Sequence, residues 1–252
     1  MVRASLGTTI FIVGRDEELW DEQVHRARAA GAQHLKIFLE YPPGNGELRE
    51  RQIRRLQNLV KGLRTLVHVP VSWPSLITPH ERLYRLSLQE IKDTLTVAVK
   101  LSAELVTFLG GPIPFSQFRH GQDASQRFKQ GVGELLPLAH ELGQPLAIEN
   151  LAAGYPSSPE ELEEALAAGL KLSLNVDQVS KGGRDPLDLL KEFRERVAEV
   201  VIGSPADWEL LVGYLKGASF AGFLTLNVPP GPERWSQVQE LLIKLRGAWE
   251  GE

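Results

Sequence analysis

The chain has 252 residues, of which 42% are hydrophobic, 7% aromatic and 24% charged, which is typical of a globular protein and not of a disordered or fibrous one. Lysine and arginine number 28 against 32 aspartates and glutamates, so the formal net charge is −4 and no basic excess indicates a nucleic-acid partner. Cysteine is absent, which excludes disulfides, thiolate nucleophiles and cysteine-bound metal clusters.

The N-terminal apolar run, residues 6–13, predicts a first strand and not a secretion signal. It has no small-residue cleavage site and leads directly into Arg15 and Asp16. The longest stretch without a charged residue or histidine, 217–232, contains three prolines and is shorter than the roughly 20 apolar residues of a membrane-spanning helix. We therefore expect no membrane segment and a cytoplasmic protein.

One pattern repeats eight times along the chain: a short apolar run, a loop with proline or glycine, and a charged amphipathic stretch. The apolar runs predict strands at 9–13, 35–39, 65–69, 105–109, 146–148, 172–176, 200–202 and 223–226. The amphipathic stretches predict helices at 17–30, 47–63, 80–102, 124–142, 159–168, 186–196, 205–216 and 233–249.

Eight strand–helix units in about 250 residues match a closed (β/α)₈ TIM barrel, an α/β fold, forming a single domain over residues 1–252. A doubly wound open sheet is the alternative. Neither G-x-G-x-x-G nor G-x-x-x-x-G-K-[ST] follows the first strand, so the nucleotide-binding motifs of open sheets are missing. The sequence therefore favours the barrel.

Alternation along the strands predicts which side chains enter the barrel. On the sixth strand, Leu172, Leu174 and Val176 are expected to face the helices, which directs Ser173, Asn175 and Asp177 inward. The same rule applied to the other strands gives a polar upper interior, with Lys36, Phe38, Glu40, His68, Glu149, Thr225 and Asn227 pointing in. In TIM barrels the carboxyl ends of the strands form the site, so we expect any ligand to bind there.

Three segments at strand ends, 67–70 (VHVP), 146–150 (LAIEN) and 174–177 (LNVD), resemble the xylose isomerase-like TIM barrels. That superfamily includes sugar and sugar-phosphate isomerases and epimerases, inosose dehydratases and endonuclease IV. The resemblance extends over the whole chain through the order and spacing of the eight units.

The resemblance implies a divalent metal, Mn, Co, Mg or Zn, with Glu149 and Asp177 matching two of its ligands. Other positions depart from the family pattern: Ser180 and Asn227 stand where histidine and glutamate are usual, and Lys36 stands where the second strand usually carries a glutamate. An amide cannot take the proton that the eighth-strand glutamate takes in many members. We therefore expect no stoichiometric metal at the family position.

The catalytic candidates are Glu149, Asp177 and Lys36, and Lys36 is expected to form a charge-assisted contact with Glu149, Asp177 or Glu40. A sugar-like small molecule is the expected partner, with neither nucleic acid nor membrane. The candidate substrate-binding residues are Glu40, His68, Trp73, Asn150, Lys181 and Asn227, with Tyr41 on the rim.

Three functions remain open from the sequence. The first, as the resemblance implies, is a sugar or sugar-phosphate isomerase or epimerase, or a related lyase, acting on a small polyol or carbonyl compound. The second is a non-catalytic barrel that binds a ligand or a protein, favoured if the 110–123 loop seals the mouth. The third is Schiff-base chemistry through Lys36, which requires a lowered lysine pKa.

Overall fold

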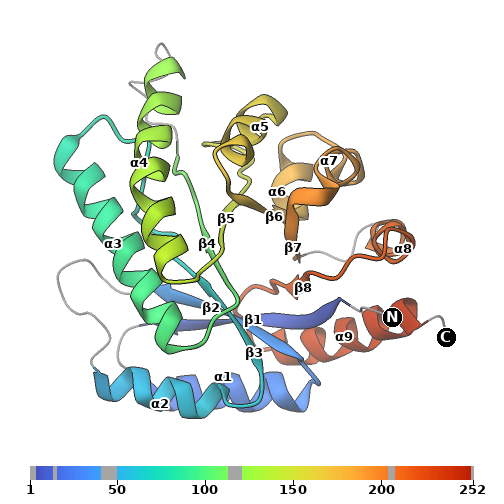
Figure 1. Cartoon of the computed structure of the whole chain (residues 1–252). Helices are drawn as coiled ribbons and strands as arrows, with labels where there is room; N and C mark the ends of the chain where they lie inside the picture. The colour runs from blue at the N-terminus through green and yellow to red at the C-terminus, as the bar shows by residue number, and fades with distance from the viewer. Residues whose placement is uncertain (1–3, 14–15, 41–49, 113–120, 204–207, 251–252) are drawn as a thin grey trace.

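The computed structural model describes residues 4–13, 16–40, 50–112, 121–203 and 208–250. Eight parallel strands pair in chain order and close into a barrel, with helices on the outside (Figure 1). The strands are β1 (Ser5–Val13), β2 (His34–Glu40), β3 (Arg64–His68), β4 (Leu105–Phe108), β5 (Leu146–Glu149), β6 (Lys171–Asn175), β7 (Val197–Ile202) and β8 (Phe223–Leu226). The helices are α1 (Glu17–Ala29), α2 (Glu50–Val60), α3 (Glu81–Lys100), α4 (Gly121–Glu141), α5 (Pro159–Ala167), α6 (Val176–Lys181), α7 (Pro186–Glu192), α8 (Trp208–Gly217) and α9 (Arg234–Glu250).

The predicted barrel is confirmed, with two differences that affect the site. The seventh strand begins at Val197, three residues before the predicted start, so Glu199 belongs to it. The sixth strand ends at Asn175, and the short helix α6 follows at once where the sequence had predicted more strand. The Asn175 side chain accepts a hydrogen bond from the Gln178 amide and so caps α6.

Helix starts follow the expected capping chemistry. Ser158 and Glu161 form a capping box at the start of α5, with Pro159 in the first turn. Asp185 caps α7, accepting a hydrogen bond from the Leu187 amide. These local signals set where each helix begins after its strand.

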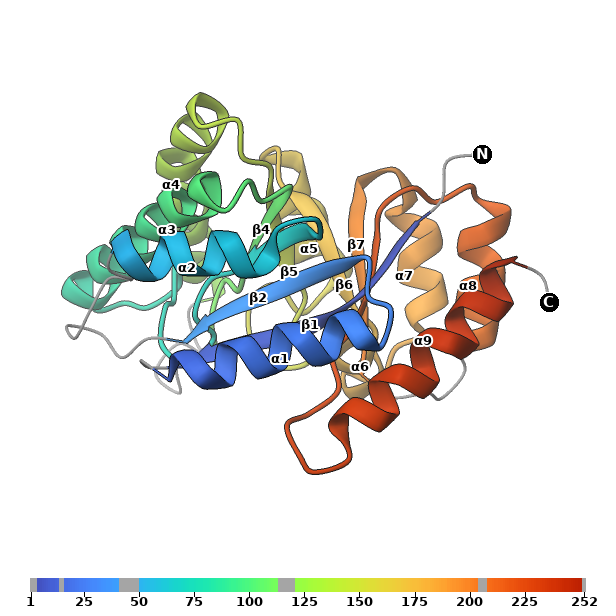
Figure 2. The ribbon, with the colours of Figure 1, turned by 90° about the horizontal axis from the view of Figure 1, so that it is seen from below.

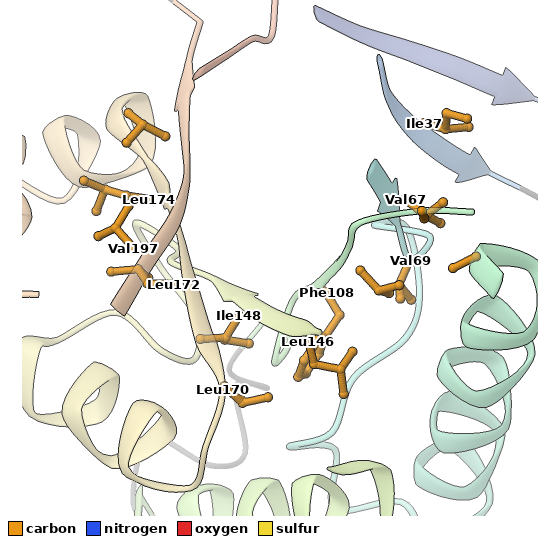
Figure 3. Packing of buried hydrophobic residues seen from close by; sticks show 14 of the residues in the cluster. Ile37, Val67, Val69, Phe108, Leu146, Ile148, Leu170, Leu172, Leu174 and Val197 are labelled. Carbon is orange, nitrogen blue, oxygen red and sulfur yellow. The ribbon is translucent and has the colours of Figure 1, made fainter. Parts of the chain in front are cut away.

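The main core lies between the strands and the helices. Leu172, Leu174, Leu146 and Ile148 are at most 3% exposed and pack in this shell, as the alternation predicts (Figure 3). A smaller apolar cluster lies in the barrel interior; it consists of Leu66, Leu105, Ala147 and Phe223. Polar side chains share the interior with this cluster, from Ser5 and His34 at the amino ends of β1 and β2 to Glu149 at the carboxyl end of β5.

Helices α1 and α9 cover β1 from the outside (Figure 2). Within the described residues, no helix is both long and apolar enough to cross a membrane.

Candidate functional site

Lys36 is the centre of a buried charged cluster inside the barrel. Its ammonium donates to Oε2 of Glu149 at 2.9 Å and to Oε2 of Glu199 at 2.8 Å. The lysine side chain is completely buried, as is that of Glu199, and Glu149 is 9% exposed. The prediction that Lys36 pairs with an interior carboxylate is thus confirmed for Glu149, and Glu199 is a second partner.

Glu199 is held by hydroxyl groups as well as by the ammonium. Ser173 donates to its Oε2 at 2.6 Å and Thr225 donates to its Oε1 at 2.6 Å. The Thr225 hydroxyl lies 2.9 Å from Nε2 of His34, whose Nδ1 lies 3.0 Å from the Ser5 hydroxyl. Because Thr225 donates to Glu199, its oxygen accepts from His34 Nε2–H, and Nδ1 accepts from Ser5.

The charges of this cluster follow from its pairing. Burial alone would lower the pKa of Lys36, but Glu149 and Glu199 outweigh it and the pKa is raised. Burial likewise opposes ionisation of Glu149, yet Lys36, together with His68 and Asn175, holds its pKa well below the usual range. Burial, with smaller contributions from Arg64 and Lys36, lowers the pKa of His34 to about 3, so this ring is neutral at pH 7.

These protonation states decide one of the open functions. Schiff-base chemistry needs a neutral amine, and the paired carboxylates keep Lys36 charged. The required lowering of the lysine pKa does not occur.

Glu149 is tied to the end of the next strand. Its Oε1 accepts from Nδ2 of Asn175 at 2.8 Å. Oδ1 of Asn150 accepts a hydrogen bond from the backbone amide of Asn175 at 2.7 Å, and its Nδ2 donates to the Asn175 carbonyl at 3.1 Å. The side-chain amide of Asn150 therefore joins the ends of β5 and β6.

His68 is fully buried beside Glu149. Its ring stacks on Phe38 with centroids 4.4 Å apart, and its Nδ1 donates to the Val69 carbonyl. Its Nε2 lies 3.5 Å from Oε2 of Glu149, which is long for a hydrogen bond. His68 is thus an interior residue at the floor of the mouth.

Asp177 was predicted as an inward residue of the sixth strand, and the structure places it in the first turn of α6. Strand alternation therefore does not apply to it. Its carboxylate nevertheless lies over the end of β7, in the space that a side chain at Gly203 would need, and that space also adjoins the Asn227 carbonyl. Asp177 and Asn227 are thus brought together at the carboxyl-terminal mouth.

The other predicted site residues are distributed less compactly. Asn227 accepts from the Thr9 hydroxyl at 3.2 Å. Glu40 accepts from the Val71 amide and the Ser72 hydroxyl at 2.7 and 3.0 Å, so its carboxylate orders the loop after β3. Trp73 is half-buried in that loop, Lys181 is exposed at the end of α6, and Tyr41 lies outside the described residues.

Part of the 110–123 loop is also outside the described residues. Its first residues run beside the segment after β5, where the Tyr155 amide donates to the Gly111 carbonyl at 2.9 Å.

Two cluster residues were missed by the sequence reasoning. Glu199 and His34 both lie inside the barrel, one at the third residue of β7 and the other at the first residue of β2. Each precedes the apolar run that was taken as the strand. Extending the alternation backward by one or two residues would have placed both side chains inside.

The donor set does not suit the divalent metal implied by the resemblance. Both oxygens of Glu149 already accept hydrogen bonds, from Lys36 and Asn175, and the ammonium supplies the positive charge. In the described parts of the chain, no group of three or more histidine, aspartate or glutamate side chains could hold a metal ion.

Comparison with known proteins agrees with the barrel fold described above. A family model described as xylose isomerase-like TIM barrel matches residues 24–177, more than half of the chain. A search of curated proteins finds no significant match.

Solved structures that resemble this one share little sequence with it. A D-tagatose 3-epimerase-like protein is 15% identical, with a TM-score of 0.81 and 98% of each chain covered. D-psicose 3-epimerase with D-tagatose, from Clostridium cellulolyticum, is 14% identical, with a TM-score of 0.75 and 97% of each chain covered. Endonuclease IV from Thermus thermophilus is 20% identical, with a TM-score of 0.70, covering 98% of this chain and 100% of that one.

Proposed function

The chain belongs to the xylose isomerase-like TIM barrel family, and from this premise we propose that it is a sugar isomerase or epimerase acting on a small polyol or carbonyl compound at the carboxyl-terminal mouth of its barrel. The observation that carries the proposal is the Lys36–Glu149–Glu199 cluster beneath that mouth. Buried charges cost free energy, and well-packed apolar residues often serve stability equally well. A charged floor under the usual site of TIM-barrel ligands therefore favours a functional role.

The residues of the proposed site divide into two groups, one at the floor of the mouth and one at its rim. Glu149 and Lys36 are bonded to one another, so they set the charge and shape of the floor and hold Asn175 in place. Asp177 is half-buried at the rim and is the carboxylate best placed to exchange a proton with a bound carbonyl compound. Asn227 is placed to hydrogen-bond a hydroxyl group, although its amide cannot act as a base.

A metal would normally stabilise the enediolate in this kind of chemistry. Since the donor set of this barrel does not suit one, we derive no step through a metal. The proposal places the proton transfer on Asp177 and the binding of substrate hydroxyl groups on the polar residues around it.

The test is a panel of aldoses and ketoses incubated in deuterium oxide with the purified protein. The proposal expects deuterium at the carbon next to the carbonyl and a new epimer or isomer by NMR. Asp177→Asn should abolish this exchange while retaining binding, and Asp188→Asn, the same change at an exposed position of α7, is the matched control.

A non-catalytic ligand-binding barrel is the second candidate. The observation that favours it is that both Glu149 oxygens are already engaged and the eighth strand offers an amide. Calorimetric binding of a panel sugar with no deuterium exchange at any carbon would select this second function over the first.

A further inference from the structure

Arg234, the first residue of α9, is a buried cation with neutral partners. It is only 5% exposed. Its Nη2 donates to the carbonyl and hydroxyl oxygens of Thr9, and its Nη1 donates to Oε1 of Gln23 at 3.3 Å. Its Nε is buried and has no hydrogen-bond partner in the described structure.

This arrangement differs from that of Lys36, a second buried cation among the described residues. Lys36 has two carboxylates at 2.9 and 2.8 Å. Around Arg234, burial is the one influence that shifts its pKa, which falls to about 10, and no carboxylate of the described chain forms an ion pair with it. Arginine is almost never buried unless it is paired. Among the described residues, however, the charge of Arg234 has no counter-charge.

The guanidinium lies at the edge of the mouth. Its Cζ is 5.0 Å from the ring centre of Phe11 and 4.8 Å from that of Trp235. Phe11 pairs in register with the inward-facing Phe38, and the Thr9 hydroxyl that Arg234 contacts also donates to Asn227 at 3.2 Å. Arg234 and Asn227 therefore share Thr9 as a partner, and the positive end of the α9 dipole adds to the guanidinium charge.

We propose that Arg234 is the anion-binding residue of the mouth, so that the polyol or carbonyl compound bound there carries a phosphate or carboxylate group. This inference rests on the proposed function and narrows its substrate class. The anionic group would lie on the β8–β1 side, beside Arg234. The hydroxyl-bearing part would extend toward Asn227 and Asp177, whose carboxylate would repel the anionic end.

The experiment is isothermal titration calorimetry of the full chain with inorganic phosphate and three matched ligands: D-fructose, D-fructose 6-phosphate and D-gluconate. The variants are Arg234→Gln and Arg234→Lys. Arg246→Gln is the matched control, because Arg246 lies at the other end of α9 and donates to the Gly31 carbonyl at 3.0 Å. We expect the anionic ligands to lose about 10- to 100-fold in affinity in Arg234→Gln, less in Arg234→Lys and nothing in Arg246→Gln.

A second measurement uses the wild-type protein, so that the test does not depend on whether the variants fold. Phosphate should shift the NMR signals of the Asn227 side-chain amide and the Trp235 indole. Anion binding that survives Arg234→Gln, as expected from a site at the exposed Arg51 and Arg54 of α2, overturns the inference.

The remaining outcomes separate the two proposals. Equal affinity for fructose and its phosphate also overturns the inference while leaving the proposed function standing. Arg234-dependent anion binding without turnover supports the inference and contradicts the catalytic proposal. Binding of no sugar and no phosphate contradicts both.

Discussion

Lys36 on β2 and Glu149 on β5 belong to strands three places apart around the barrel, yet their side chains meet at 2.9 Å in its interior. The lysine stem crosses the interior, where its ammonium also meets Glu199. One side chain therefore links three strands through two charge-assisted bonds.

Replacing Lys36 with methionine should strongly destabilise the fold. The substitution keeps the volume but leaves two buried carboxylates without their cation, and breaking a buried pair in this way costs about 3–5 kcal/mol. Urea unfolding followed by circular dichroism measures the free energy of unfolding. Lys181→Met, at an exposed position, should change it by less than about 0.5 kcal/mol, and equal stability of the two variants would contradict the account of the cluster.

The purified protein should contain no stoichiometric transition metal at the family position. The physical reason is that both Glu149 oxygens are engaged and the eighth strand offers Asn227 in place of a carboxylate. Mass-spectrometric metal analysis after exposure to Mn, Co, Mg and Zn provides the measurement. About one metal per chain in the wild type, lost in Glu149→Gln, would show the prediction to be wrong.

The free energy of unfolding should fall between pH 6.5 and pH 4 because of His34. Its pKa is about 3 in the folded chain and near 6.5 in the unfolded chain, so the unfolded state binds a proton first. This stabilisation is complete above pH 6.5 and is lost as the pH falls toward 3, with a slope approaching about 1.4 kcal/mol per pH unit.

His34→Gln should flatten this part of the stability curve, measured by urea unfolding at pH 7, 5.5 and 4. His140→Gln, which alters an exposed histidine at the end of α4, should leave the slope unchanged. A slope that persists in His34→Gln would assign the acid sensitivity to other groups.

Gly203→Ala should displace the Asp177 carboxylate. A methyl group at Gly203 would overlap Oδ2 of Asp177, the far end of a side chain that can rotate away. We expect stability to change by about 1 kcal/mol or less and sugar turnover to fall about tenfold or more, as a misplaced catalytic group does. Gly213→Ala on α8, where a methyl group meets nothing within 4 Å, is the matched control. If both variants retain full turnover, turnover does not depend on the present position of the Asp177 carboxylate.

The fold was predictable because the apolar runs and capping residues carry it locally. The sixth strand shows this well: the alternation of Leu172 and Leu174 with Ser173 and Asn175 correctly assigned both faces. In this strand the pattern failed at the end, where Asn175 caps a helix, since an asparagine at a strand end fits either continuation and Asp177 follows it into α6.

The buried charged residues of the interior were harder to predict from the sequence than the fold. Lys36 was expected inside with a carboxylate partner, but Glu199 interrupts an apolar strand near its beginning, where a charged residue usually marks the end of the buried segment. Arg234 gave no signal at all, because an arginine beginning an amphipathic helix is normally exposed. Its burial depends on the free backbone of β1 at Thr9, which only the closed barrel reveals.

The ammonium at the centre of the barrel is covalently part of the chain, so its presence is not governed by a dissociation constant. A bound ion can be diluted, exchanged for a competing ion or withdrawn by a chelator, and each event changes the field inside a metal-dependent barrel. In this protein the positive charge next to Glu149 is fixed at one per molecule once Lys36 is translated. The ion pairs of Lys36 with Glu149 and Glu199 therefore need no ion taken up from solution.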